Sequence, residues 1–261
     1  MFGFFKRKSD KKIEEQESRI STFEDYNDVA SIAEYFKRET GVHFDQQTSI
    51  LKSKVKSFCK THHIPSFTLL LEKVMDEVLL KQKLIDYLTT NETFFYREFA
   101  QIEELVHKVK DFHGKVHILC APCSTGEECY SISIALLEAG IEASRFSIMG
   151  IDINSEAIEK AHKALYRERN IRNLSPDILE RHFIRVDDHH KLKELSKSSV
   201  TLRRMNIFDP DFKQLQKYDF IFSRNMLIYF DKKTKRKAKD ILESMLKNDK
   251  QPVFFGHADL F

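Results

Sequence analysis

The sequence predicts an α/β protein with a parallel β-sheet, preceded by a smaller all-helical domain. Two observations predict this fold class. From about residue 114 onward, apolar runs with the length of buried strands alternate with helix-like segments. Before residue 89, apolar residues recur at helical spacing instead. The 261 residues of the chain are enough for one large domain or two of ordinary size.

Composition and charge exclude several classes of protein. Apolar residues make up 41% and charged residues 32%, as in globular proteins with a real core. The net charge of +3 is too weak to argue for a nucleic-acid partner. No stretch approaches the roughly 18 apolar residues of a membrane span, and the apolar run at the start is too short for a signal peptide. We therefore expect a cytoplasmic monomer that neither inserts into a membrane nor binds nucleic acid.

The N-terminal part divides into a flexible charged segment, residues 1–23, and a helical domain, residues 24–88. In the helix around residue 55, Ile50 or Leu51 shares one face with Val55 and Phe58. Lys52, Lys56 and Lys60 recur every fourth residue on another face, and Lys54 adds a fourth charge to this basic set. This set is either a solvated helix face or a docking surface for an acidic partner.

Residues 89–113 are expected to be a linker. The stretch TTNETFFYRE mixes polar residues that cap helices with a run of aromatic residues. Such a mixture is typical of a linker or of the entry to a new helix.

Residues 114–261 form the predicted sheet domain. We expect strands at 116–122, 145–153, 218–225 and 252–258, and helices at 127–139, 155–166 and 231–246. Residues 182–205 interrupt this rhythm with short polar strands. They predict a small antiparallel insertion whose later part returns to the sheet.

In an open parallel sheet, ligands bind beyond the carboxyl ends of the strands. Three stretches fall there: CSTGEE after the first strand, Asp152 after the second, and Ser223-Arg224-Asn225 after a later one. Asp152 lies 26 positions beyond Gly126. That is close to the interval of roughly 20 residues at which a carboxylate binds a ribose. The alternative, an Asp N-cap, is less favoured because Asn154 and Ser155 are better placed to cap the next helix.

The loop CSTGEE contains one glycine and two glutamates, Glu127 and Glu128. A pyrophosphate at a helix N-terminus needs backbone N–H groups and no nearby negative charge. The glutamates favour a cationic ligand, so they indicate S-adenosylmethionine rather than NAD. Compensation of the helix dipole alone is the alternative, above all for Glu128.

Cys120-Ala-Pro-Cys123 is a CxxC motif. It lacks the second pair that a zinc site requires, and a redox role is only weakly indicated. Ordinary reduced core cysteines are the favoured interpretation, and no metal site is expected.

Several motifs together resemble the CheR family of chemotaxis receptor methyltransferases. They are TTNETFFYRE, CSTGEE, GIDI, NLSP with the basic strands after it, FSRNMLIYFD and FFGHADLF. The resemblance covers nearly the whole chain from about residue 25. It implies a Rossmann-like methyltransferase domain behind a helical domain. It also implies methyl transfer from S-adenosylmethionine to glutamate side chains on the cytoplasmic helical bundle of chemoreceptors, with methyl esters and S-adenosylhomocysteine as products, for receptor adaptation.

The resemblance also implies roles for particular residues. Glu127 meets the methionine end of the cofactor and Asp152 meets its ribose. Arg97 and Tyr229 face the incoming glutamate. The remaining cofactor contacts are Asn91, Thr93, Arg97 again, Asn206, Ile207, Arg224 and Asn225. From the residues alone, Arg97 could instead form a surface ion pair with Glu92 or Glu98, and Tyr229 could be a core aromatic beside Phe230.

The resemblance favours receptor docking for the basic helix that carries Lys52, Lys54, Lys56 and Lys60. Two departures from the family stand out. The insertion contains VDDHHKLKELSKSSV, without the glycine-rich loop of members that bind a receptor's C-terminal pentapeptide, so we expect no such tether. The chain also stops at GHADLF, where relatives continue into an antiparallel strand pair, so we expect a short or truncated sheet.

Three other functions compete with receptor methylation. A non-catalytic module that binds S-adenosylmethionine or scaffolds receptors is disfavoured by the retention of Arg97 and Tyr229. A methyltransferase for a small molecule or RNA is a second alternative, and the lack of a basic–aromatic surface makes RNA less favoured. An NAD oxidoreductase is disfavoured by the single glycine of CSTGEE.

Overall fold

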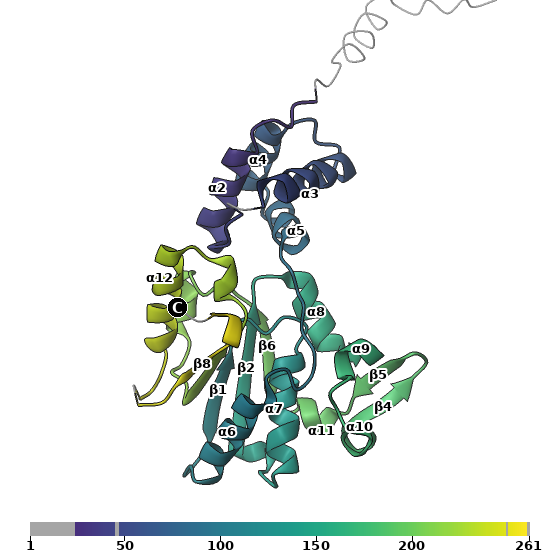
Figure 1. Cartoon of the computed structure of the whole chain (residues 1–261), viewed down its shortest axis with the longest axis vertical. Coiled ribbons are helices and arrows are strands. Elements are labelled where there is room, and N and C mark those ends of the chain that lie inside the picture. The colour runs from purple at the N-terminus through teal and green to yellow at the C-terminus, as the bar shows by residue number, and fades with distance from the viewer. Residues whose placement is uncertain (1–23, 45–46, 249, 260–261) are drawn as a thin grey trace, which may run out of the picture. The chain divides into compact units, whose positions relative to one another are not determined.

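The computed structural model describes residues 24–44, 47–248 and 250–259 (Figure 1). The predicted flexible segment, residues 1–23, lies outside this range. The chain divides into two compact units. In described residues, the helical unit comprises 24–35 with 44–81, and the sheet unit comprises 36–43 with 82–259.

The boundary between the units differs from the predicted one at residue 88. Residues 82–88 belong to the sheet unit because polar side chains fasten them there. The Gln82 amide donates to the carbonyl of Ile153 at 2.8 Å. The Asp86 carboxylate accepts from the backbone N–H of Ser155 at 2.7 Å and from its hydroxyl at 2.5 Å.

The helical prediction for residues 24–88 is confirmed. The helices are α2 (Val29–Thr40), α3 (Thr48–Thr61), α4 (Phe67–Asp76) and α5 (Val78–Leu88). In α3, Leu51 rather than Ile50 is buried, together with Val55 and Phe58. The four predicted lysines lie on the remaining faces of α3, and the Nζ atom of Lys56 lies 5.3 Å from the centroid of the Tyr26 ring.

The sheet unit contains a five-stranded parallel sheet in the order β6-β2-β1-β7-β8. Its strands are β1 (Val116–Cys120), β2 (Phe146–Asp152), β6 (Val200–Arg204), β7 (Phe220–Ser223) and β8 (Val253–Phe255). Its longer helices are α6 (Phe99–Lys110), α7 (Glu127–Glu138), α8 (Ser155–Lys163) and α12 (Lys232–Glu243). The shorter ones are α9 (Glu168–Ile171), α10 (Pro176–His182) and α11 (Glu194–Lys197), with the 3-10 turns η1 (Ala143–Arg145), η2 (Pro210–Gln214), η3 (Leu227–Tyr229) and η4 (His257–Asp259).

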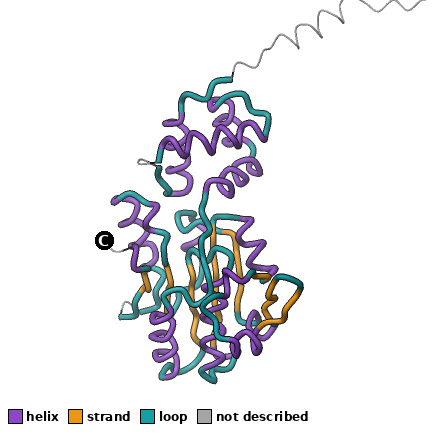
Figure 2. The backbone as a smooth tube through the Cα atoms, turned by 45° about the vertical axis from the view of Figure 1, so that its right-hand side comes forward, coloured by secondary structure: helices purple, strands orange, loops and turns teal. Residues whose placement is uncertain are grey.

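Alternate residues of the central strand β1 pack into separate cores on the two faces of the sheet. Figure 2 shows the strands in orange, flanked by helices in purple. Ile118 and Cys120 join one core with residues of α6, α7 and α8. Leu119 joins the other with residues of α12 and η2. This arrangement follows from the two-residue period of a strand and confirms the predicted helices on both faces.

The segment 89–113 is not a simple linker, because it contains α6. Ile102, Leu105 and Val109 of this helix are fully buried in the core of the sheet unit. Their spacing of three and four residues is that of an amphipathic helix.

A separate antiparallel sheet in the order β3-β5-β4 confirms the predicted insertion. Its strands are β3 (Leu165–Tyr166), β4 (Phe183–Val186) and β5 (His189–Leu192). The predicted helix 155–166 is too long, since the chain leaves α8 at Ala164 with a φ of 48° and enters β3. β6 then returns to the main sheet and pairs in parallel with β2, as predicted. No helix in the described part of the chain is both long and apolar enough to cross a membrane.

Candidate active site

Four neighbouring parallel strands carry the candidate residues at their carboxyl ends. Cys120 of β1 is in register with Gly150 of β2 and with Phe222 of β7. Asp152, at the end of β2, is in register with Arg204 of β6. The structure thus brings the loop 121–126, Asp152, Asn206 and Arg224 to the same edge of the sheet (Figure 1).

The loop after β1 requires glycine at its last position. Gly126 has a φ of 92°, and an added Cβ would lie 2.9 Å from Cε2 of Tyr130 and 3.0 Å from Cβ of Ala161. The backbone N–H of Cys123 donates to the carbonyl of Ile151 at 2.8 Å, which joins the loop to β2. The single glycine therefore lets the chain turn tightly against α8.

Asp152 is buried, with 6% of its surface exposed. Its carboxylate accepts from the backbone N–H groups of Ser124 at 2.8 Å and Asn154 at 2.9 Å. Burial raises the pKa of Asp152 to about 6, although these hydrogen bonds oppose the rise. The N-cap of α8 is Asn154, whose side chain accepts from the N–H of Ala157. Asp152 is thus not the cap, and each of its oxygens retains capacity for a further donor.

Glu127 is fully buried at the start of α7. It accepts a hydrogen bond from the Thr125 hydroxyl at 2.6 Å and another from the Asn170 amide at 2.8 Å. Burial raises the pKa of Glu127, and both hydrogen bonds oppose that rise. Asn170 was not predicted from the sequence, because it lies in the short helix α9 and belongs to no recognised motif.

Glu128 forms a buried ion pair with Arg224, with only 8% and 3% of the two side chains exposed. The Arg224 guanidinium also donates to the carbonyl of Arg97 at 2.7 Å. Glu128 therefore does more than compensate the helix dipole. The pair ties α7 to the turn after β7 and to the segment that carries Arg97.

The surroundings of Arg97 differ from those of a surface ion pair, and the surroundings of Tyr229 differ from those of a core aromatic residue. Arg97 donates to the carbonyl of Glu92 at 3.1 Å, and no carboxylate in the described part of the chain forms an ion pair with it. Tyr229 is 37% exposed, whereas its neighbour Phe230 is the buried core aromatic. Burial raises the pKa of Tyr229, Glu92 adds to the rise, and Arg97 opposes it. The charge of Arg97 therefore acts on the Tyr229 phenol.

The remaining predicted residues lie at or near this edge in different environments. Asn91 and Thr93 are half-buried ahead of α6. The Asn206 amide donates to the carbonyl of Glu39 at 2.8 Å, and Ile207 is buried in the core. Asn225 has a φ of 59° in the turn after β7.

A second missed residue, Asp259, fixes the turn after β7. Its carboxylate accepts from the backbone N–H groups of Asn225 at 2.5 Å, Ile228 at 3.1 Å and Gly256 at 3.2 Å. Asp259 is fully buried. Three backbone donors on one carboxylate hold the segment between Arg224 and Tyr229 in a single conformation.

Residues 91–261 match the family model described as CheR methyltransferase, SAM binding domain. The chain belongs to the CheR methyltransferase family. It is 37% identical over 224 residues to a chemotaxis protein methyltransferase of Campylobacter jejuni, covering 85% of this chain and 84% of the relative. It is 34% identical over 185 residues to a chemotaxis protein methyltransferase of Salmonella typhimurium, covering 69% and 64%.

One solved structure to which the chain is weakly similar is PKMT2 from Rickettsia typhi in complex with AdoHcy. It matches 62% of this chain and 25% of its own, with 13% identity and a TM-score of 0.38. A match this weak carries no argument of its own. Family membership makes the chain a methyltransferase that uses S-adenosylmethionine, as the sequence predicted.

The residues present fit that cofactor. Asp152 and Glu127 are buried carboxylates at the sheet edge, suited to ribose hydroxyls and to a cationic group. The Ser124 hydroxyl beside Asp152 is buried without a hydrogen-bond partner in the described part of the chain. By contrast, Cys120 and Cys123 are free buried thiols whose pKa burial raises, which suits core packing rather than chemistry.

Proposed function

We propose that this CheR-family enzyme methylates glutamate side-chain carboxylates of chemoreceptors, giving glutamate methyl esters and S-adenosylhomocysteine. The observation that carries the proposal is the Arg97 guanidinium. It has no carboxylate partner among the described residues, its charge acts on Tyr229, and the buried pair of Glu128 and Arg224 holds its backbone. Such a group is suited to receive a carboxylate from another molecule.

Glu127 and Asp152 would hold the cofactor, the first at its methionine end and the second at its ribose. Asn91, Thr93, Asn206, Ile207 and Asn225 would complete the pocket. When bound, S-adenosylmethionine supplies an electrophilic methyl group on a sulfonium ion.

The acceptor glutamate needs no general base from this chain. Its reference pKa is about 4.3, so it is ionised at neutral pH. What the chain must supply is alignment, and positioning effects contribute roughly 7–11 kcal/mol in favourable systems. The planar guanidinium of Arg97 can hold one carboxylate edge. The Tyr229 phenol, with an ordinary pKa of about 10 that burial raises further, keeps its proton at neutral pH and can donate to the same carboxylate.

Receptor docking is proposed for the basic residues of α3: Lys52, Lys54, Lys56 and Lys60. A pentapeptide tether is not part of the proposal. The β4–β5 hairpin closes through Asp187 and Asp188 alone, without glycine. Competable binding of a receptor C-terminal pentapeptide, measured by calorimetry, would overturn that element. The enzyme is proposed to act in the cytoplasm as a monomer.

The test uses methyl-labelled S-adenosylmethionine with receptor-containing membranes. Base-labile label released as methanol from receptor protein is the expected result, since carboxyl methyl esters hydrolyse in base and N-methyl groups do not. Base-stable label, label in nucleic acid, or cofactor binding without transfer would overturn the proposal. The last outcome would favour a non-catalytic scaffold.

Arg97→Ala is the matched site test. We expect kcat/KM to fall about 100-fold, which corresponds to about 2.7 kcal/mol, with the far-UV circular dichroism spectrum unchanged. Arg172→Ala is the control, because the Arg172 guanidinium also lies over the Phe94 ring, 3.8 Å from its centroid, yet has no proposed role. Turnover within twofold of wild type in Arg97→Ala would remove Arg97 from the active site.

A further inference from the structure

A cleft at the surface of the sheet unit is lined mainly by cations. It has a volume of about 630 Å³ and lies between α12 and η2. The basic residues that line it are Lys213, Lys232, Lys233, Arg236 and Lys237. Asp240 is the one carboxylate in the lining, so the cleft carries a net charge of +4, more than the +3 of the whole chain.

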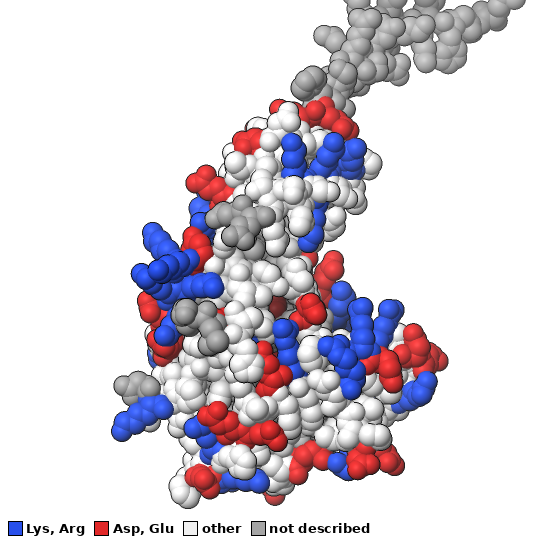
Figure 3. All heavy atoms as spheres, in the orientation of Figure 1, with Lys and Arg blue, Asp and Glu red and all other residues white. Residues whose placement is uncertain are grey.

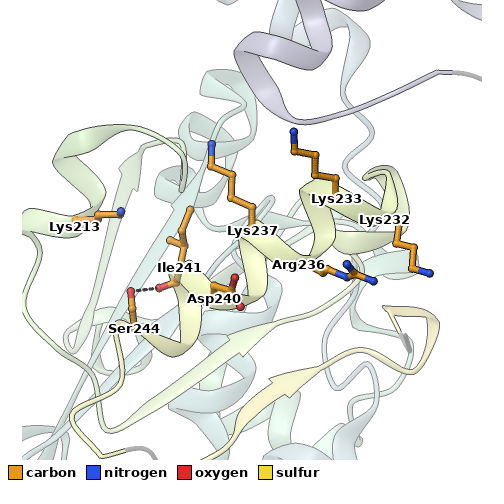
Figure 4. Close-up of a pocket in the computed structure, with 8 residues that line it drawn as sticks. All are labelled: Lys213, Lys232, Lys233, Arg236, Lys237, Asp240, Ile241 and Ser244. Carbon is orange, nitrogen blue, oxygen red and sulfur yellow. Dashed lines mark hydrogen bonds between the residues drawn. The ribbon is translucent and has the colours of Figure 1, made fainter.

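The cationic side chains are exposed and lack acidic partners. Figure 4 shows Lys233 and Lys237 rising side by side from successive turns of α12, with Lys213 pointing toward the helix from η2. No carboxylate in the described ranges forms an ion pair with the five cleft cations. Asp231, the acid that directly precedes Lys232, is 2.7 Å from the Nζ atom of Lys37. The basic side chains over α12 also form one of the blue areas of Figure 3.

The positions of these cations along α12 are unfavourable for the helix itself. Its first turn contains Lys232 and Lys233 and no acidic residue, and its last turn contains no basic residue. The helix dipole places positive charge at that first turn, so it adds to the field of the lysines instead of offsetting it. The N-cap residue, Asp231, is acidic, but its carboxylate is paired with Lys37 at 2.7 Å. The arrangement concentrates positive potential at one end of the cleft.

We propose that this cleft docks an acidic segment of a partner protein. The cations of α12 run from Lys232 to Lys237, about 7.5 Å along the helix axis, and Lys213 adds a fifth charge from η2. Cations spread over two turns of a helix and a separate turn of the chain match carboxylates repeated along a polypeptide better than one compact anion. The surface is separate from α3 and does not rest on the proposed methyl transfer.

Other linear or planar anions fit less well. Nucleic acid recognition favours arginine and aromatic stacking platforms. The lining has one arginine and no aromatic residue, and Phe208 lies beneath Lys237, with 5.0 Å between Nζ and the ring centroid. An anionic membrane favours apolar residues beside the charges, but the apolar residues of α12 are buried in the core: Ala238, Ile241 and Leu242.

The test measures fluorescence anisotropy of a labelled 16-residue peptide with glutamates four residues apart, titrated with the full chain. We expect binding that weakens with added salt, while the peptide with glutamine at the same positions does not bind. Lys233→Gln/Arg236→Gln/Lys237→Gln should weaken binding about tenfold, from three lost surface ion pairs. The control is Lys110→Gln/Lys160→Gln/Lys163→Gln, which removes three lysines elsewhere on the sheet unit and should bind within twofold of wild type.

Three results would overturn the proposal. The first is equal affinity of the cleft variant and the control variant. The second is affinity that depends only on Lys54, Lys56 and Lys60 of α3. The third is tighter cleft-dependent binding of a 12-nucleotide RNA or of phosphatidylserine vesicles than of the glutamate peptide.

Discussion

Helices α7 and α12 occupy equivalent places in the sheet unit, but their first turns carry opposite charges and differ in burial. Each has 12 residues, and they follow β1 and β7, two adjacent parallel strands. α7 opens with Glu127 and Glu128, and it is buried from there to Leu136. α12 opens with Lys232 and Lys233, and its cationic side chains stay in solvent.

This difference in burial determines how the charges of each helix can contribute to function. In α7, a buried charge needs a defined partner, and Glu128 has Arg224 as its partner. Such charges are fixed in position and can organise a cofactor site. In α12, solvation makes each charge weak and screened, so only a row of charges can select a partner. Single substitutions should therefore have large effects in α7 and small ones in α12.

The largest expected effect comes from the buried ion pair. Glu128→Gln leaves the Arg224 guanidinium buried without its anion, and the free energy of unfolding should fall by roughly 3–5 kcal/mol, measured by urea titration. The double variant Glu128→Leu/Arg224→Met removes both charges and should regain most of that loss. Glu156→Gln, which removes an exposed partner of Lys160, should change stability by less than about 0.5 kcal/mol. A loss below 1 kcal/mol in Glu128→Gln would contradict the contrast between the two helices.

An intermediate effect is expected at Asp152, through pH. Its pKa of about 6 in the folded chain lies above the ordinary 3.8, so the folded state holds the extra proton between these values. The contribution of Asp152 to stability without cofactor therefore falls as pH rises through that window. Ribose hydroxyls donate to the ionised form, so affinity for S-adenosylhomocysteine should rise over the same window, by roughly fivefold from pH 5 to 6.

Calorimetry at several pH values checks the Asp152 prediction. Asp152→Asn should bind S-adenosylhomocysteine more weakly at pH 7.5 and show a flatter pH profile. Glu127 contributes the remaining slope, since burial raises its pKa too. A wild-type profile without any slope between pH 5 and 7 would remove Asp152 from the ribose site.

The smallest expected effect has the opposite sign and lies in α12. Lys232→Glu replaces an exposed cation at a helix N-terminus with an anion, and stability should rise by about 0.3–1 kcal/mol in low salt. Lys110→Glu places the same change in the last turn of α6, where the dipole favours the cation, so stability should fall by a similar amount. Thermal unfolding of both variants at two salt concentrations measures the difference. If Lys232→Glu proves destabilising, the lysines of α12 serve the fold itself.

The sequence by itself determined the class of fold and the loops that bear the site. Apolar runs and helical periodicity are local patterns, so strands β1, β2, β7 and β8 and helices α7, α8 and α12 could be predicted within a few residues. The motifs around Arg97, Glu127, Asp152 and Asn225 could also be identified from the sequence. Each lies at the end of an element whose type could be predicted. Even α6 could have been found from the spacing of Ile102, Leu105 and Val109.

Only the tertiary structure decided which side chains meet. Arg224 pairs with Glu128 across 96 positions, and Asn170 donates to Glu127 across 43. The cleft combines Lys213 with α12 from a separate turn of the chain. Such pairings depend on the order of strands in the sheet and on burial, which removes water as an alternative partner for each charge. Local sequence patterns reveal neither the order of the strands nor the burial of a charge, so these partners can be identified only from the folded structure.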